Sequence, residues 1–156
     1  MHTEEEAAGL DAARRMFDGD KASAGLGIEL VELKPGRAVA RMRVTGSMLN
    51  GHAIGHGGYV FLLADTAFAL ACNSHGPAAV AAGADVSFLA AVNEGDVLTA
   101  RAEERVLYGR SGIYDVTVTR AAVAEPEAGT AAETDQEATE QVVAEFRGRS
   151  RVVAGR

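Results

Sequence analysis

A single carboxylate, Asp65, lies in the middle of an apolar stretch that the sequence predicts to be a helix over residues 58–74. An ionised carboxylate that is buried alone is costly, so such a group is normally paired, protonated or functional. The residues one helical turn away, Phe61, Leu62 and Phe68 among them, offer it no partner. Two interpretations follow: a structural Asp that bonds a backbone group or faces water, and a catalytic base or nucleophile, which we favour.

The residues just before this helix, His56, Gly57 and Gly58, favour the catalytic interpretation. The start of a helix has free N–H groups and the positive end of the helix dipole, which can polarise a carbonyl or hold an oxyanion. Glycine also lets a ligand approach the backbone closely. Taken alone, the two glycines are equally consistent with a tight turn.

The spacing between Gly57 and Asp65 constrains how they can act together. They are eight residues apart, which is ~12 Å along a helix that rises about 1.5 Å per residue. One reacting carbonyl must lie ~3 Å from both the oxyanion donor and the attacking group. Two copies of the helix, packed antiparallel about a two-fold axis, meet this requirement. If both residues are catalytic, we expect a homodimer or larger assembly with its sites at the interface.

Other residues of this region could do chemistry but fit it less well. His52 and His56 are four residues apart, a spacing that suits a metal on a helix, yet they fall in a Gly-rich loop over residues 46–58. No carboxylate or Cys lies beside them, so we expect no metal site. Cys72 is expected to pack as a hydrophobic residue, and His75 to interact with the C-terminal end of the helix dipole.

The remaining pattern predicts the elements that position these residues. An amphipathic helix is predicted within residues 1–20, an antiparallel hairpin follows it, and four strands follow the apolar helix. A helix that is apolar on nearly all sides must be enclosed, so we expect an α+β fold with one sheet curved around a central helix. The predicted ranges are 4–18 for the first helix, 26–33 and 37–44 for the hairpin, and 80–91, 97–107, 113–119 and 142–153 for the later strands.

Length and composition fit a single globular domain over residues 1–156. The net charge is −7, but the six acids of residues 122–141, predicted to be an acidic flexible loop, leave only −1 for the rest. No basic patch indicates nucleic acid, and no apolar run is long enough to span a membrane. The single Cys and the acidic start of the chain are typical of a cytoplasmic protein.

Three motifs resemble the hotdog-fold acyl-CoA thioesterases, and in particular the phenylacetyl-CoA thioesterase (PaaI) group. They are GHGGYVFLLADTAFALACNSHG from Gly55, GRSGIYDVTV from Gly109 and FRGRSRVV from Phe146. The first motif is specific and the other two are supportive. The resemblance implies a curved antiparallel sheet around one long helix, which agrees with the elements predicted above.

The resemblance also implies an activity: hydrolysis of acyl-CoA thioesters, with phenylacetyl-CoA or related aryl and hydroxylated acyl-CoAs as substrates. It implies Asp65 as general base or nucleophile, the Gly57 N–H as the group that polarises the carbonyl, Asn50 as a positioning residue and His56 as a residue that orders the loop. It further implies homodimers paired into homotetramers, no metal and no cofactor, since coenzyme A is part of the substrate. Substrate contacts are implied at Gly58, Phe61, Thr66, Gly109, Arg110, Ser111 and Gly112.

Arginines are the expected partners of the CoA phosphates. Arg110 lies in a turn that matches the nucleotide side in the family, and it is our first candidate. Arg147, Arg149 and Arg151 recur at every second residue, so they share one face of the last strand. A solvated charged face is the favoured interpretation of these three, because scattered surface arginines are common.

The chain departs from the family at two places. Related chains usually read Phe-Leu-Arg-Pro where this one has Phe88-Leu89-Ala90-Ala91, so a guanidinium is missing there. The acidic segment 122–141 is longer than the usual turn.

Two other functions remain open at this point. A hydratase or dehydratase acting on acyl thioesters could use His56 and Asp65 as an acid/base pair. An acyl-CoA-binding module would bind its ligand without releasing the thiol. Phe61, Phe68 and Phe88 fit either the core or an acyl pocket.

Overall fold

The computed structural model describes residues 3–121 and 140–153. Its elements are α1 (Glu4–Asp18), α2 (Lys21–Gly25), β1 (Glu29–Lys34), β2 (Arg37–Arg43), η1 (Gly46–Met48), α3 (Gly57–Asn73), β3 (Ala79–Phe88), β4 (Val97–Tyr108), β5 (Ser111–Ala121) and β6 (Glu140–Val152). The predicted loop 122–141 falls outside the described residues except for Glu140 and Gln141, which begin β6.

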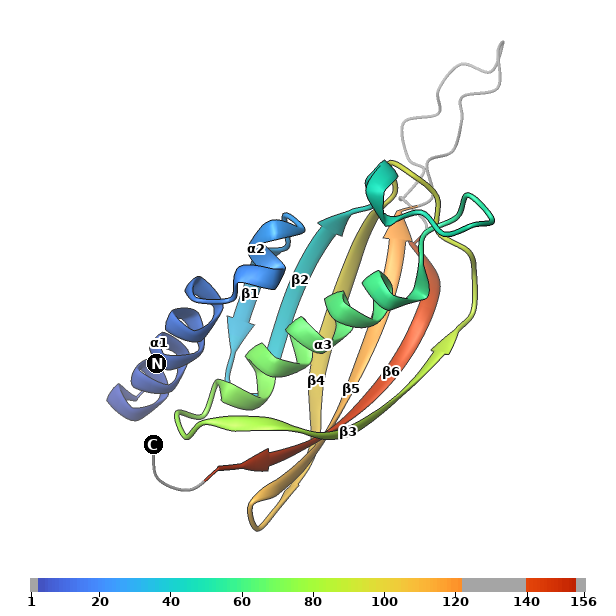
Figure 1. The fold of residues 1–156 in the computed structure, drawn as a ribbon. Helices are drawn as coiled ribbons and strands as arrows, with labels where there is room; N and C mark the ends of the chain where they lie inside the picture. Colours follow the sequence, from blue (N-terminus) through green and yellow to red (C-terminus); the bar gives the residue numbers. More distant parts are fainter. Residues whose placement is uncertain (1–2, 122–139, 154–156) are drawn as a thin grey trace, which may run out of the picture.

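One antiparallel sheet carries the fold, with strand order β1-β2-β4-β5-β6-β3. It curves around α3, which lies across its inner face, and α1 sits beside one end of that helix (Figure 1). The short helix α2 contacts α3 nearer its middle, through Ser23 and Thr66. The α+β hotdog architecture predicted from the sequence is therefore confirmed.

The core lies between α3 and the inner face of the sheet. Period-two alternation on the strands turns Val116, Val118 and Phe146 inward, and all three are buried. Leu63 and Phe68 of α3 pack against this face. Phe61, Leu62, Asp65 and Ala69 are only partly buried, so the prediction that the helix is enclosed all round fails along the stripe that carries Asp65.

The N-terminal helix is built as the sequence indicates. Thr3 and Glu6 form a reciprocal capping box at the start of α1. The helix crosses the end of α3 at Gly9, where a Cβ would fall on the Ser74 carbonyl oxygen and 3.0 Å from the His75 carbonyl carbon. Only glycine permits this close approach of two backbones.

Two predicted boundaries were wrong. The first strand begins at Glu29 rather than at residue 26, because the unpredicted helix α2 is followed by Gly27 in the left-handed region (φ 68°) and the Ile28 N–H bonds Ser23. The strand expected to reach residue 91 ends at Phe88, where the chain leaves the sheet and both Leu89 and Ala90 donate to the Val143 carbonyl. The other elements begin and end within two residues of their predicted positions.

Candidate active site

The N-terminus of α3 is shaped by its own cap. His56 is the N-cap residue, and its Nδ1 accepts a hydrogen bond of 2.9 Å from the Gly58 N–H. His56 thereby orders the turn, and the Nδ1 lone pair is occupied. Within the described part of the chain, no hydrogen bond uses the Gly57 N–H. This donor is therefore free for a ligand at the positive end of the helix dipole.

The loop before the helix is held by Asn50. Its Oδ1 accepts from the backbone N–H of His52 (2.9 Å) and of Ile54 (3.4 Å), and its own N–H bonds the Ile54 carbonyl. This ring of bonds supports Ala53 in the left-handed region, at φ 60°. Asn50 thus shapes the loop through its side-chain oxygen.

A cavity of about 430 Å³ opens beside Gly57. Its lining is largely apolar and includes Ile54, Val60, Val143 and residues 88–92. The Phe88 ring packs directly on Gly57, since a Cβ there would lie 2.9 Å from the ring. A glycine at this position therefore leaves room both for the ring and for a ligand that reaches the free N–H.

Asp65 lies on the partly covered side of α3 and is half-buried. Within the described residues its carboxylate accepts no hydrogen bond. Burial raises the pKa of Asp65, and the nearby Asp20 carboxylate raises it further. A carboxylate that is poorly solvated and unpaired accepts a proton more readily than a solvent-exposed carboxylate does.

Gly57 and Asp65 belong to one unbroken helix, Gly57–Asn73. The axial separation expected from their spacing therefore applies, and one chain does not bring the two residues to the same reacting atom. The structure places Gly58, exposed, beside Gly57 at the helix start.

Comparison with known proteins identifies the family of the chain. The family model described as thioesterase superfamily matches residues 52–126. The acyl-coenzyme A thioesterase PaaI of Escherichia coli K12 is 46% identical over 106 residues, covering 68% of this chain and 76% of that protein. The chain belongs to the thioesterase superfamily. It is therefore a thioester hydrolase.

Solved structures of thioesterases have the same fold as this chain. The structure of E. coli PaaI, a protein from the phenylacetic acid degradation operon, superposes with a TM-score of 0.81 at 38% identity, covering 97% of this chain and 98% of that one. A hypothetical thioesterase from Streptococcus pneumoniae TIGR4, solved with coenzyme A, superposes with a TM-score of 0.73 at 26% identity, covering 91% and 98% of the two chains.

The other predicted contacts of the thioesterase lie at different depths on α3. Phe61 is half-buried, with its ring edge-on to Phe146 at a centroid distance of 5.3 Å. Thr66 is buried beneath α2, where its hydroxyl lies 2.9 Å from the Ser23 hydroxyl, which in turn donates to Asp20. The Thr66 hydroxyl thus serves the packing of α2 on α3 in the single chain.

Gly109 and Arg110 form the turn between β4 and β5, and Ser111 and Gly112 are the first residues of β5. Gly109 takes a left-handed φ of 60°, and Arg110 is exposed. The turn lies at the opposite end of the long strand β5 from the cavity beside Gly57 (Figure 1). Within one chain, the predicted nucleotide contact therefore lies far from the predicted catalytic groups.

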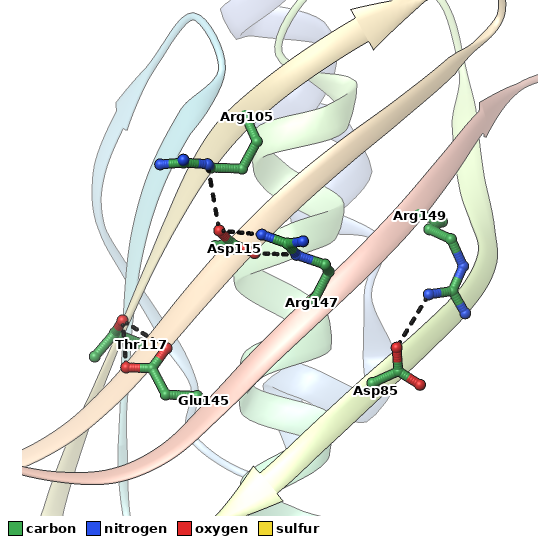
Figure 2. A network of polar contacts seen from close by, with 7 residues as sticks. All are labelled: Asp85, Arg105, Asp115, Thr117, Glu145, Arg147 and Arg149. Carbon is green, nitrogen blue, oxygen red and sulfur yellow. Dashed lines mark hydrogen bonds and ion pairs between the residues drawn. The ribbon is translucent and has the colours of Figure 1, made fainter.

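Two of the three regularly spaced arginines are engaged on the outer face of the sheet. Arg147 makes a two-point contact with Asp115 at 2.7 and 3.0 Å, and Arg149 bonds Asp85 at 3.1 Å (Figure 2). Arg147, together with Arg105, lowers the pKa of Asp115. The solvated charged face is therefore the better interpretation of Arg147 and Arg149, whereas Arg151 is exposed.

Cys72 is buried, and burial raises the pKa of its thiol to about 12, with a further contribution from Asp65. It packs as a hydrophobic residue, as predicted. His75 bonds Glu104, with its Nε2 2.6 Å from Oε1. No helix among the described residues is both long and apolar enough to cross a bilayer.

Sequence reasoning missed two groups near the site. Asp20, which acts on Asp65, is the N-cap of α2 and accepts from the Ser23 N–H at 3.0 Å. Asp is a favoured N-cap residue, but Ser23 three positions on is not the Glu or Gln of a capping box, so the local signal is weak. Arg120 of β5, whose guanidinium contacts the cavity wall at Ala91, carries no local signal, since that contact joins residues 29 positions apart.

Proposed function

We propose that this thioesterase hydrolyses acyl-CoA thioesters at sites shared between two copies of the chain. In each site the Gly57 N–H of one copy polarises the carbonyl, and Asp65 of the other supplies the base or nucleophile. The single observation that carries the proposal is the free Gly57 N–H, which lies at a helix N-terminus beside an apolar cavity of about 430 Å³.

The substrate class draws its support from the relatives. E. coli PaaI is named an acyl-coenzyme A thioesterase, and the S. pneumoniae protein was solved with coenzyme A. Phenylacetyl-CoA and related aryl or hydroxylated acyl-CoAs are the proposed substrates, because E. coli PaaI comes from a phenylacetic acid degradation operon. The apolar cavity wall, which includes the Phe88 ring, suits an acyl group of this kind.

The chemistry needs a polarised carbonyl, an activated nucleophile and a leaving thiolate. In the general-base route Asp65 takes a proton from water as the water oxygen bonds the carbonyl carbon. The resulting oxyanion is held by the Gly57 N–H and the α3 dipole, and it collapses as the C–S bond breaks. In the nucleophilic route an Asp65 oxygen attacks the carbonyl instead, and water then hydrolyses the anhydride. A thiolate leaves more readily than an alkoxide, so neither route needs a general acid.

The edge of the sheet supports a homodimer. β3 bonds β6 on one side only and ends the sheet, so its other edge is available to a second strand. Two large apolar side chains of this strand, Val80 and Phe88, are 51% and 54% exposed. Because Phe88 packs on Gly57, a two-fold contact between β3 edges also places the Gly57 end of α3 at the interface. Pairing of two dimers into a homotetramer is proposed from the family resemblance.

The same two-fold contact supports Arg110 as a ligand of the CoA phosphates. The Arg110 carbonyl accepts from the Val152 N–H at 2.7 Å, and Val152 pairs with Ala79 at the start of β3. Antiparallel contact of two β3 strands sets the start of one against the end of the other. Arg110 of the partner subunit then approaches the cavity beside Gly57, and it forms no ion pair within the described part of its own chain.

Thiol release across a panel of aryl- and alkyl-CoAs tests this function. Wild-type protein should release the thiol, most rapidly with the aryl substrates, and Asp65→Asn should reduce turnover ~10²-fold or more because it removes the base or nucleophile. Circular dichroism and sedimentation of the variant provide the control, since fold and assembly should stay unchanged.

Three results would contradict the proposal. Turnover of Asp65→Asn close to wild type would refute the role of Asp65. Tight acyl-CoA binding by wild type without thiol release would indicate a binding module. An intact thioester with a change at the acyl double bond would indicate a hydratase or dehydratase.

A further inference from the structure

Residues 89–96 connect β3 to β4 and form one wall of the cavity beside Gly57. We call this segment the wall loop. It contributes Leu89, Ala90, Ala91 and Val92 to the cavity lining. Alanines at positions 90 and 91 have no polar side chain with which to anchor the loop, so its position depends on its backbone groups and on side chains of other residues.

The wall loop is in direct backbone contact with the loop that leads to Gly57. The Gly55 N–H donates to the Val92 carbonyl at 2.8 Å. The two residues also pack tightly, because a Cβ at Gly55 would overlap the Val92 side chain. Gly55 is two residues before Gly57, and His56 between them donates its N–H to Met48 at 2.8 Å. A shift of Val92 is therefore transmitted to the start of α3.

Backbone bonds hold both ends of the wall loop, to Val143 at residues 89–90 and to Val44 at residues 95–96. Between them, one guanidinium adds a side-chain anchor. Arg120 on β5 donates through Nη1 to the Ala91 carbonyl and to Asp96 Oδ2, the latter at 3.2 Å. Asp96 Oδ2 also accepts the Asn93 N–H at 2.8 Å. Through Nε and Nη2, Arg120 bonds Gln141 Oε1 at the start of β6, at 3.0 and 2.6 Å. The Arg120 side chain is only 20% exposed, and its bond to Asp96 is partly buried.

We propose that Arg120 is a positioning residue for thioester hydrolysis. It fixes the wall loop to β5 and β6 and so sets both the width of the cavity and, through the Val92–Gly55 contact, the direction of the Gly57 N–H. Arg120 does not touch the reacting atoms. Its kinetic consequence rests on the proposed function, whereas its effect on the backbone does not.

Arg120→Ala and Arg120→Lys test this role, with Arg101→Ala as the matched control. Arg101 also joins neighbouring strands at this end of the sheet, donating to Thr119 at 3.1 Å and to Glu140 at 2.8 Å. Within the described residues it makes no bond to the wall loop. Both alanine variants remove one interstrand guanidinium, so melting temperatures reveal any difference in global stability.

In kinetics, Arg120→Ala should lower kcat/KM for acyl-CoA about tenfold or more, since small misplacement of a positioned group is costly to the rate. A loosened wall raises KM, and a misdirected Gly57 N–H lowers kcat, so both should change. Arg120→Lys keeps a donor for Ala91 and should recover part of the loss. Arg101→Ala should stay within about twofold of wild type, as is usual for a surface pair.

Amide hydrogen exchange of the ligand-free protein gives a readout that needs no activity. In Arg120→Ala, but not in Arg101→Ala, exchange at the Gly55 amide should accelerate, because the loop that carries its acceptor, Val92, loses its side-chain anchor. Equal effects of the two alanine variants on exchange and kcat/KM would overturn the proposal. Faster exchange with unchanged kcat/KM would also overturn it. Absence of thiol release from wild type would instead count against the proposed function, and the exchange comparison would still decide whether Arg120 anchors the loop.

Discussion

The proton affinity of Asp65 is set by two features that act in the same direction. Half-burial on α3 removes solvent from the carboxylate, and the Asp20 carboxylate at the start of α2 adds a like charge, so both raise the pKa of Asp65. A folded-state pKa above the unfolded value means that this group contributes stability at low pH and loses it as pH rises through the folded value. Ionised Asp65 is thus a strained group, which is compatible with a role in catalysis rather than in stability.

Asp20→Asn should shift the acidic limb of the kcat/KM profile to lower pH. The amide removes the charge that raises the pKa of Asp65, and Asn remains a good N-cap for α2, so the Ser23 bond is kept. The profile is measured by thiol release. Asp18→Asn, an identical change at an exposed position, is the control and should leave the limb in place. If the two profiles coincide, Asp20 does not tune Asp65.

At the scale of elements, α1 is seated on the end of α3 by one residue without a side chain. Gly9→Ala should destabilise the protein by ~1–3 kcal/mol, because the new methyl group meets backbone atoms of residues 74–76 that cannot yield. This cost exceeds the helix propensity that alanine brings, about 1 kcal/mol. Urea unfolding measures the difference.

Gly25→Ala supplies the matched control for that change. Gly25 is also helical, but a Cβ there would meet nothing within 4 Å. It should therefore be neutral or stabilise the protein by about 0.4–1 kcal/mol. Equal stabilisation by both substitutions would show that α1 can move away from α3 without loss.

The elements with regular periodicity could be predicted closely from sequence. The helix of residues 4–18 and the strand of residues 37–43 show their pattern locally, and each lies where it was expected. The sequence could not show α2, a helix of five residues with no room for a period, nor the departure of β3 from the sheet after Phe88. That departure depends on the Val143 carbonyl, which is far away in the chain.

The residues of the candidate site also differ in whether the sequence alone could locate them. Gly57 and His56 could be located because a helix start has a local signature, and the structure shows the free N–H and the cap bond that this signature implies. The cavity wall and Arg120 could not, since they arise only when strands distant in sequence are paired. For the same reason, the sequence could not show whether the regularly spaced arginines are paired, because Asp115 and Asp85 contact Arg147 and Arg149 from neighbouring strands.

At the scale of the whole molecule, the shared site makes a prediction about mixed assemblies. Gly57→Pro removes the N–H while keeping the backbone, because proline suits the first position of a helix and His56 already has the extended ψ of 131° that precedes proline. Alone, it should lose ~10²–10³-fold in kcat, as expected for removal of one oxyanion donor. This loss is comparable to the one expected of Asp65→Asn, which removes the base or nucleophile.

Refolded together, the two inactive variants should regain activity. A mixed dimer has one site with an intact Gly57 from one chain and an intact Asp65 from the other, so its kcat approaches half that of wild type per dimer. Gly57→Ala, which meets the same Phe88 ring but keeps the N–H, is the control for steric effects. Persistent inactivity of the mixture would place each site within a single chain.

The burial of Cys72 has a practical consequence for every assay proposed above. Hydrolysis of an acyl-CoA liberates a free thiol, which is commonly detected with a chromogenic disulfide reagent that reacts with thiolates. The protein's own thiol is its single cysteine, buried and with a pKa of about 12, so the native enzyme contributes almost no background colour. Unfolding exposes one reactive thiol per chain. The same reagent therefore reports turnover in the native protein and, without substrate, the fraction of molecules that have lost their fold.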